Sequence, residues 1–232
     1  MSKVFRPLLS GAAAALLLLG GAVSAQQPSG EDRVAALKSS LASSKAVLRQ
    51  YEWIETTVVN LKGEDKSTLQ ERGYYGADGA LQKVPVGAPP ADKKKPGLRG
   101  KIVENKKEEM SDYMKEAVAL VKRYLPPDPA KVDAVKAAGR LSVSPQPGNK
   151  IRVTLAGYLK PGDSLAVDMN MADNTPASAT VVSTMDSDNA PVSLTVQFGK
   201  LDNGAIYESQ TVLDAKGKDL KVTIQKSGYR RM

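Results

Sequence analysis

The sequence predicts an α+β protein: a curved antiparallel sheet of about ten strands, with about three helices covering its concave face. Three observations predict this fold. Apolar residues alternate with polar ones from residue 51 to 86 and again from residue 139 onward, which is typical of half-buried strands. In the second region, turn sequences recur every 8 to 15 residues, as antiparallel hairpins require. Helical periodicity is confined to three stretches before residue 139. The strands predicted after it therefore have no helix between them that could serve as a parallel crossover.

The first 25 residues have the features of a cleavable signal peptide. Lys3 and Arg6 precede an apolar stretch over 8–21, and Val23-Ser24-Ala25 matches the small-x-small pattern that signal peptidase recognises. The apolar stretch is shorter than the roughly 20 residues that span a bilayer. Removal of this segment lowers the formal net charge from +8 to +6. We therefore expect an exported chain, residues 26–232, that forms a single domain.

This exported chain is expected to be periplasmic and without a lipid anchor. Residue 26 is Gln, whereas a bacterial lipoprotein has Cys at the cleavage point. The whole chain contains no cysteine, so disulfides cannot stabilise it and packing must do so.

The first elements expected after the signal peptide are a helix and three strands. A helix is predicted over 31–49, with its apolar residues near one stripe. Trp53, Thr57, Val59 and Leu61 then alternate with polar residues in a first strand that begins at Tyr51. Further strands are expected over 66–76 and 81–86, joined by the hairpin signal Asp78-Gly79.

Two helices should follow a proline-rich loop over 87–100. The first, over 101–124, carries an apolar stripe at i, i+3, i+4, i+7 spacing and ends before Pro126. We expect it to act as a lid through Met110, Met114, Val118 and Val121. The second helix runs from Pro129 to about Ala138.

About seven strands are predicted after Gly139, and together the strands are wider than the helices can cover. Ten strands at about 4.8 Å spacing make a sheet near 45 Å wide, whereas a helix covers about 10 Å. Either the sheet leaves an apolar concavity for a ligand, or it closes and fills its own interior. The residues that would line such a concavity are Trp53, Leu165, Val167, Met169, Met171, Leu194, Val196 and Phe198.

The missing residue types exclude several kinds of chemistry. Without histidine or cysteine there is no Ser-His-Asp triad, cysteine nucleophile, haem or ordinary zinc site, and we predict no metal and no cofactor. Two phenylalanines and one tryptophan argue against a stacking platform for nucleic acid. Glu52, Glu55 and Glu71 remain as acidic candidates for a hydrolase, but they are expected on a solvated face. We therefore predict that the protein is not an enzyme.

Five segments stand out for their order along the chain: Tyr51-Glu52-Trp53-Ile54-Glu55-Thr56-Thr57, Tyr74-Tyr75-Gly76-Ala77-Asp78-Gly79, Leu201-Asp202-Asn203-Gly204, Lys221-Val222-Thr223-Ile224 and Tyr229-Arg230. Together they resemble the bacterial lipoprotein-carrier and lipoprotein-receptor superfamily, the LolA/LolB-like fold. The resemblance implies a half-open β-barrel whose helices form a lid over an apolar concavity that holds acyl chains. The chain would be an atypical member, because it lacks the receptor's lipid-anchoring cysteine.

The leading hypothesis is a periplasmic binding or carrier protein for a lipid, an acyl chain or lipoprotein-like cargo, acting as a monomer. The alternative is a non-catalytic interaction module with a closed core. In that case its basic loop, with Lys93, Lys94 and Lys95, would contact an anionic membrane surface or envelope protein.

Overall fold

Ten strands form one antiparallel sheet in the computed structural model, which describes residues 29–87 and 98–232. The order across the sheet is β3-β2-β1-β10-β9-β8-β7-β6-β5-β4. The strands are β1 (Tyr51–Leu61), β2 (Glu64–Tyr75), β3 (Leu81–Pro85), β4 (Leu141–Gln146), β5 (Lys150–Ala156), β6 (Ser164–Asn170), β7 (Pro176–Thr184), β8 (Pro191–Lys200), β9 (Ile206–Ala215) and β10 (Leu220–Arg231).

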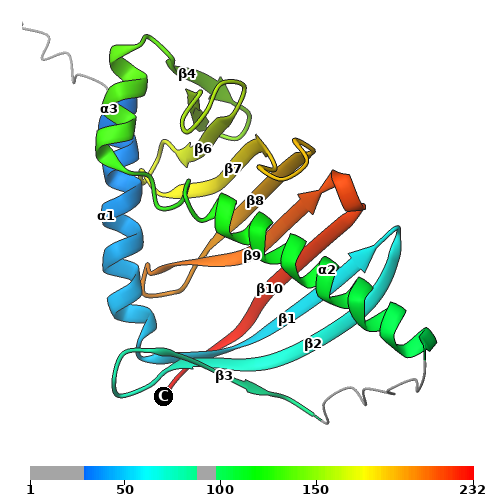
Figure 1. Cartoon of the computed structure of the whole chain (residues 1–232). Helices are drawn as coiled ribbons and strands as arrows, with labels where there is room; N and C mark the ends of the chain where they lie inside the picture. Colours follow the sequence, from blue (N-terminus) through cyan, green and yellow to red (C-terminus); the bar gives the residue numbers. More distant parts are fainter. Residues whose placement is uncertain (1–28, 88–97) are drawn as a thin grey trace, which may run out of the picture.

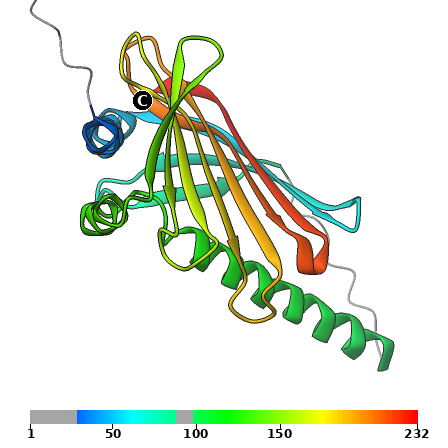
Figure 2. The same cartoon turned by 90° about the horizontal axis from the view of Figure 1, so that it is seen from above.

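The sheet stays open, because β3 and β4 lie at its two edges and do not pair with each other. It curves around three helices: α1 (Gly30–Leu48), α2 (Leu98–Val121) and α3 (Pro129–Ala137). Figure 1 shows α1 crossing one end of the strands, while α2 runs diagonally over the sheet. Seen from above, α1 and α3 lie side by side next to the sheet (Figure 2). The predicted fold class is confirmed: an α+β protein with a curved, open antiparallel sheet of ten strands and three helices.

Local sequence signals explain where two of the helices begin. Ser29 caps α1 in a capping box with Asp32, whose carboxylate accepts the backbone N–H of Ser29 at 2.9 Å. Asp128 caps α3 by accepting the N–H of Ala130 at 2.9 Å, and Pro129 occupies the first turn, where no N–H is needed. These caps define the residue at which each helix begins.

The core lies between the helices and the sheet strands from β5 to β10. Residues at every second position of β5, β6 and the first part of β8 are buried, such as Ile151, Val153 and Leu155 of β5. Leu37 of α1, Leu120 of α2 and other apolar helix residues pack against them. This alternation is the predicted pattern, because successive side chains of a strand point to opposite faces.

β-bulges interrupt the alternation at the end of the sheet beside α1, and two of them affect β9 and β10. In β10, Gly228 and Tyr229 together oppose Trp53 of β1, and Gly228 has a φ of 63°. In β9, the register with β8 shifts by one residue between Gln197 and Phe198. Each bulge moves the following side chains of its strand to the opposite face.

The structure corrects the expectation that Glu55 lies on a solvated face. Glu55 is 2% exposed and forms an ion pair with Lys83 of β3. It lies two residues after the buried Trp53, so both side chains point to the same face of β1. The period-two pattern puts Glu55 on the buried face of β1, as observed. The charge of Glu55 had suggested the exposed face instead.

Two predictions fall on residues outside the described part of the chain. These are the signal peptide, residues 1–25, and the basic cluster Lys93, Lys94 and Lys95. Within residues 29–87 and 98–232, no helix combines the length and apolar character needed to cross a membrane.

Candidate functional site

Half of the predicted binding residues belong to a closed core. Leu165, Val167 and Met169 of β6 and Leu194 of β8 are buried and pack within the main hydrophobic cluster. The same cluster contains helix residues such as Leu37 of α1 and Val135 of α3. These four side chains therefore belong to the packed core.

Of the other predicted residues, five lie away from the pocket described next and three line it. Met171 lies just beyond the end of β6 and is 40% exposed, so it is not part of the buried face. On α2, Met110, Met114 and Val118 are half-buried against the core and Val121 is buried. None of these five residues lines the pocket described next.

Trp53, Val196 and Phe198, by contrast, come together in a pocket of about 520 Å³ between α1 and the sheet. We call it the α1 pocket. Its size is typical of sites for small ligands, which span about 300–1,000 Å³. The sheet and the segment after α2 also contribute Tyr75, Leu125, Pro126, Ile206, Tyr207, Glu208, Lys226 and Tyr229.

One stripe of α1 forms the opposite wall of the α1 pocket. Lys38, Leu41, Ala42, Lys45 and Leu48 line it. Their spacing of i, i+3, i+4, i+7 and i+10 places them on the same side of the helix. The helix therefore offers the pocket a mixed surface, apolar in the middle and cationic at two points.

Four aromatic rings cluster on the sheet side of the pocket. The ring of Trp53 stacks on Tyr229, with centroids 5.5 Å apart, and lies 5.8 Å from Tyr75. Tyr229 in turn contacts Tyr207 at 4.3 Å. These distances are typical of favourable aromatic pairs, which contribute about 0.5–1.5 kcal/mol each beyond the area they bury.

A glycine and a bulge place these rings. A Cβ at Gly73 would lie 2.6 Å from the indole of Trp53, so only glycine lets the ring lie over β2. Val222, Ile224 and Lys226 share one face of β10, and without the bulge Gly228 would follow them there. The extra residue brings Tyr229 to that face instead, where it lines the pocket.

The aromatic cluster excludes water from several polar groups. The Nε1 of Trp53, which is 4% exposed, has no hydrogen-bond partner among the described residues. Burial, followed by the neighbouring Tyr207 and Glu208, raises the pKa of Tyr229 well above its ordinary value. Tyr229 therefore stays neutral into the alkaline range, and its ring adds to the apolar surface of the pocket floor.

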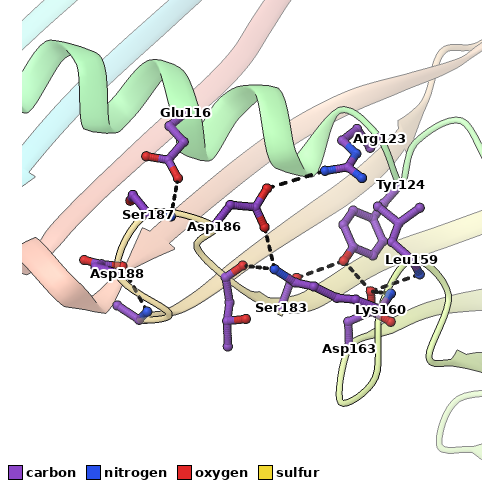
Figure 3. Close-up of polar contacts among 12 residues, drawn as sticks. Glu116, Arg123, Tyr124, Leu159, Lys160, Asp163, Ser183, Asp186, Ser187 and Asp188 are labelled. Carbon is purple, nitrogen blue, oxygen red and sulfur yellow. Dashed lines mark hydrogen bonds and ion pairs between the residues drawn. The ribbon is translucent and has the colours of Figure 1, made fainter.

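A buried network holds the wall that Leu125 and Pro126 form. Tyr124, fully buried, donates to Asp163 Oδ2 at 2.6 Å and is hydrogen-bonded to Ser183 Oγ at 2.8 Å (Figure 3). The same carboxylate oxygen accepts two backbone N–H groups of the β5–β6 loop. Burial, followed by the bond to Asp163, raises the pKa of Tyr124. The chain after α2 is thus attached to the sheet directly beside the pocket.

Two further hollows in the described residues are smaller than the α1 pocket. One of about 320 Å³ lies at the ends of β6 to β9 and is lined mainly by polar side chains, including Lys150, Asn170 and Gln197. Another, of about 250 Å³, lies behind Trp53 and includes Glu52 and Arg72. No group of three or more acidic side chains is arranged to hold a metal ion in the part of the chain that the structure describes.

Comparison with solved structures finds distant likenesses. A LolA superfamily protein from Nitrosomonas europaea is 7% identical, with 84% of this chain and 93% of that chain covered, at a TM-score of 0.36. A DUF1329 family protein from Desulfovibrio piger is 8% identical, with coverages of 87% and 91% and a TM-score of 0.39. A domain from Vibrio parahaemolyticus named for outer membrane lipoprotein sorting is 10% identical, with coverages of 88% and 94% and a TM-score of 0.39.

Two of these structures carry names from the superfamily that the sequence segments resemble. No protein-family model matches the chain, and no curated protein matches it significantly. Because the identities are at most 10% and the TM-scores below 0.4, no residue role is carried over from them.

Sequence reasoning missed most of the pocket. The apolar residues of α1 predict a helix that packs on the sheet. They do not predict that Lys38 and Lys45 line a pocket. Tyr229 is hidden from period-two alternation because a bulge breaks the pattern in β10. One usable signal was the pair Gly228-Tyr229, since a glycine inside a strand pattern often marks a bulge.

Proposed function

We propose that this protein is a periplasmic binding or carrier protein that holds an apolar chain in the α1 pocket. The cargo would be a lipid, an acylated molecule or a lipoprotein-like molecule. The single observation that carries the proposal is an unfilled pocket of about 520 Å³ with an aromatic floor, beside the packed hydrophobic cluster.

The physical reason is the free energy of burying hydrocarbon. Each methylene group removed from water contributes about 0.8 kcal/mol, so a chain of several methylenes can bind by this effect alone. Leu41 and Leu48 on the helix face Trp53 and Phe198 on the sheet, and together they offer apolar contact on two sides. Export, predicted from residues 1–25, would place the pocket where free lipid needs a soluble carrier.

Filling the pocket should weaken binding strongly. Ala42 is an exposed residue of α1 that lines the pocket, so Ala42→Phe adds a ring there without disturbing the core. We expect detergent-free wild-type protein to bind a fluorescent acyl probe saturably, and Ala42→Phe to weaken binding at least about tenfold, the equivalent of 1.4 kcal/mol.

Ala46→Phe is the matched control. Ala46 lies one turn further along α1, is exposed and does not line the pocket. Its variant should bind the probe as the wild type does. Equal loss of binding in both variants, or no probe binding by the wild type, would contradict the proposed function.

A further inference from the structure

The charged side chains of the α1 pocket do not balance. Lys38, Lys45, Lys226 and Glu208 are the charged residues in its lining. Lys226 Nζ lies 2.9 Å from Glu208 Oε2, so these two charges neutralise each other. Neither Lys38 nor Lys45 forms an ion pair in the part of the chain that the structure describes. The pocket wall on α1 therefore carries two uncompensated positive charges.

These two lysines flank apolar surface. They lie seven residues apart, two helical turns or about 10.5 Å along α1. Leu41 and Ala42 lie between them on the same stripe. A chain lying against Leu41 would thus end within reach of an ammonium group in either direction along the helix.

No carboxylate is available in the pocket to hold a cationic group. Glu208 is already paired with Lys226. Glu55, buried behind the aromatic cluster, is paired with Lys83. The electrostatic complement of this pocket is therefore an anion attached to an apolar chain.

We propose that the α1 pocket selects single-chain amphiphiles with an anionic head, a carboxylate or a phosphate, which Lys38 and Lys45 bind. This inference rests on the proposed function and adds the class of ligand. The chain occupies the space between Leu41 and Trp53, and the head stays at the exposed surface of α1. Because the lysines are exposed, their contribution should weaken as salt is added.

The test compares amphiphiles that share one dodecyl chain: dodecanoate, dodecyl phosphate, dodecyl maltoside and dodecyltrimethylammonium. Each displaces the acyl probe from purified, detergent-free protein at low ionic strength. We expect both anionic compounds to bind about fivefold to tenfold more tightly than the neutral one, and the cationic compound most weakly. Inorganic phosphate alone should not displace the probe, and displacement would assign the site to a free anion and overturn the proposal.

Lysine variants then assign the effect to residues. Lys38→Gln and Lys45→Gln should each weaken dodecanoate binding about twofold to fivefold, with the double variant close to the product, and leave dodecyl maltoside unchanged. Lys221→Gln, which removes an exposed charge from β10 away from the pocket, should change neither.

The outcomes separate this inference from the function on which it rests. Equal affinity for all four amphiphiles, or a double variant with unchanged preference, would overturn the anionic selectivity and leave the pocket as an apolar site. Absence of binding by every amphiphile would overturn both proposals.

Discussion

At the scale of single residues, two glycines make room for aromatic side chains of the α1 pocket. A Cβ at Gly73 would meet Trp53 at 2.6 Å, and one at Gly199 would meet Tyr207 at the same distance. Each glycine is paired with its aromatic residue across two strands. A ring that covers a neighbouring backbone in this way is held in place without a hydrogen bond, which leaves the pocket floor apolar.

Tyr124 is the residue whose polar contacts matter most for the pocket wall. Tyr124→Phe keeps the ring but leaves Asp163 and Ser183 without their buried partner. We expect the free energy of unfolding to fall by about 1–3 kcal/mol at neutral pH. Urea denaturation measures this, and an unchanged midpoint would contradict the role of the network.

The same residue predicts a dependence on alkaline pH. The pKa of Tyr124 is raised in the folded protein, mainly by burial, so this contribution to stability is present below the unfolded value of 10.0. As the pH rises above that value, the unfolded chain loses the proton first and stability falls. Tyr124→Phe should show a shallower decline between pH 10 and about 12 than the wild type. Parallel declines would mean that Tyr124 is not protected from ionisation.

At the scale of elements, α1 depends on contacts with the sheet for its position. Its four serines at 39, 40, 43 and 44 lower helix propensity, so packing must hold it. Ser44 shows how: it is 6% exposed, and its Oγ accepts the backbone N–H of Ile206 at the start of β9. The sequence indicated a weak helix, but the partner of Ser44 lies 162 residues away and only the fold reveals it.

Ser44→Ala should therefore destabilise the protein although alanine favours helices. It leaves the Ile206 N–H buried without a partner, which costs about 1–3 kcal/mol. Ser39→Ala is the control, because Ser39 is exposed on the same helix and should be neutral or slightly stabilising. Thermal or urea denaturation compares the two variants. Equal stability would show that the contact with β9 does not hold α1.

The strands show which side-chain orientations the sequence pattern can predict. Period-two alternation predicted the regular parts of β5, β6 and β8, including the burial of Leu165 and Val196. It could not predict the faces beyond the bulges in β9 and β10, because one extra residue inverts the alternation. The pocket lies where this regularity fails.

At the scale of the whole molecule, the concave face is divided. The part around Leu165 and Met169 is filled by helix residues, whereas the part beside α1 remains open as a pocket of about 520 Å³. The sequence is compatible with an open concavity and with a closed core, and the described residues include a packed cluster and a pocket beside it. Composition fixes the amount of apolar surface but not which helix covers which strand, since that depends on contacts between distant segments.

The most direct test of the account uses Trp53, the one tryptophan of the chain, as a contact reporter on the pocket floor. A dibrominated acyl chain and its unbrominated counterpart are titrated into detergent-free protein while the tryptophan emission is recorded. We predict saturable quenching by the brominated chain alone, and loss of that quenching in Ala42→Phe. Binding of the brominated chain with unchanged Trp53 emission would place the ligand elsewhere and contradict the assignment of the α1 pocket.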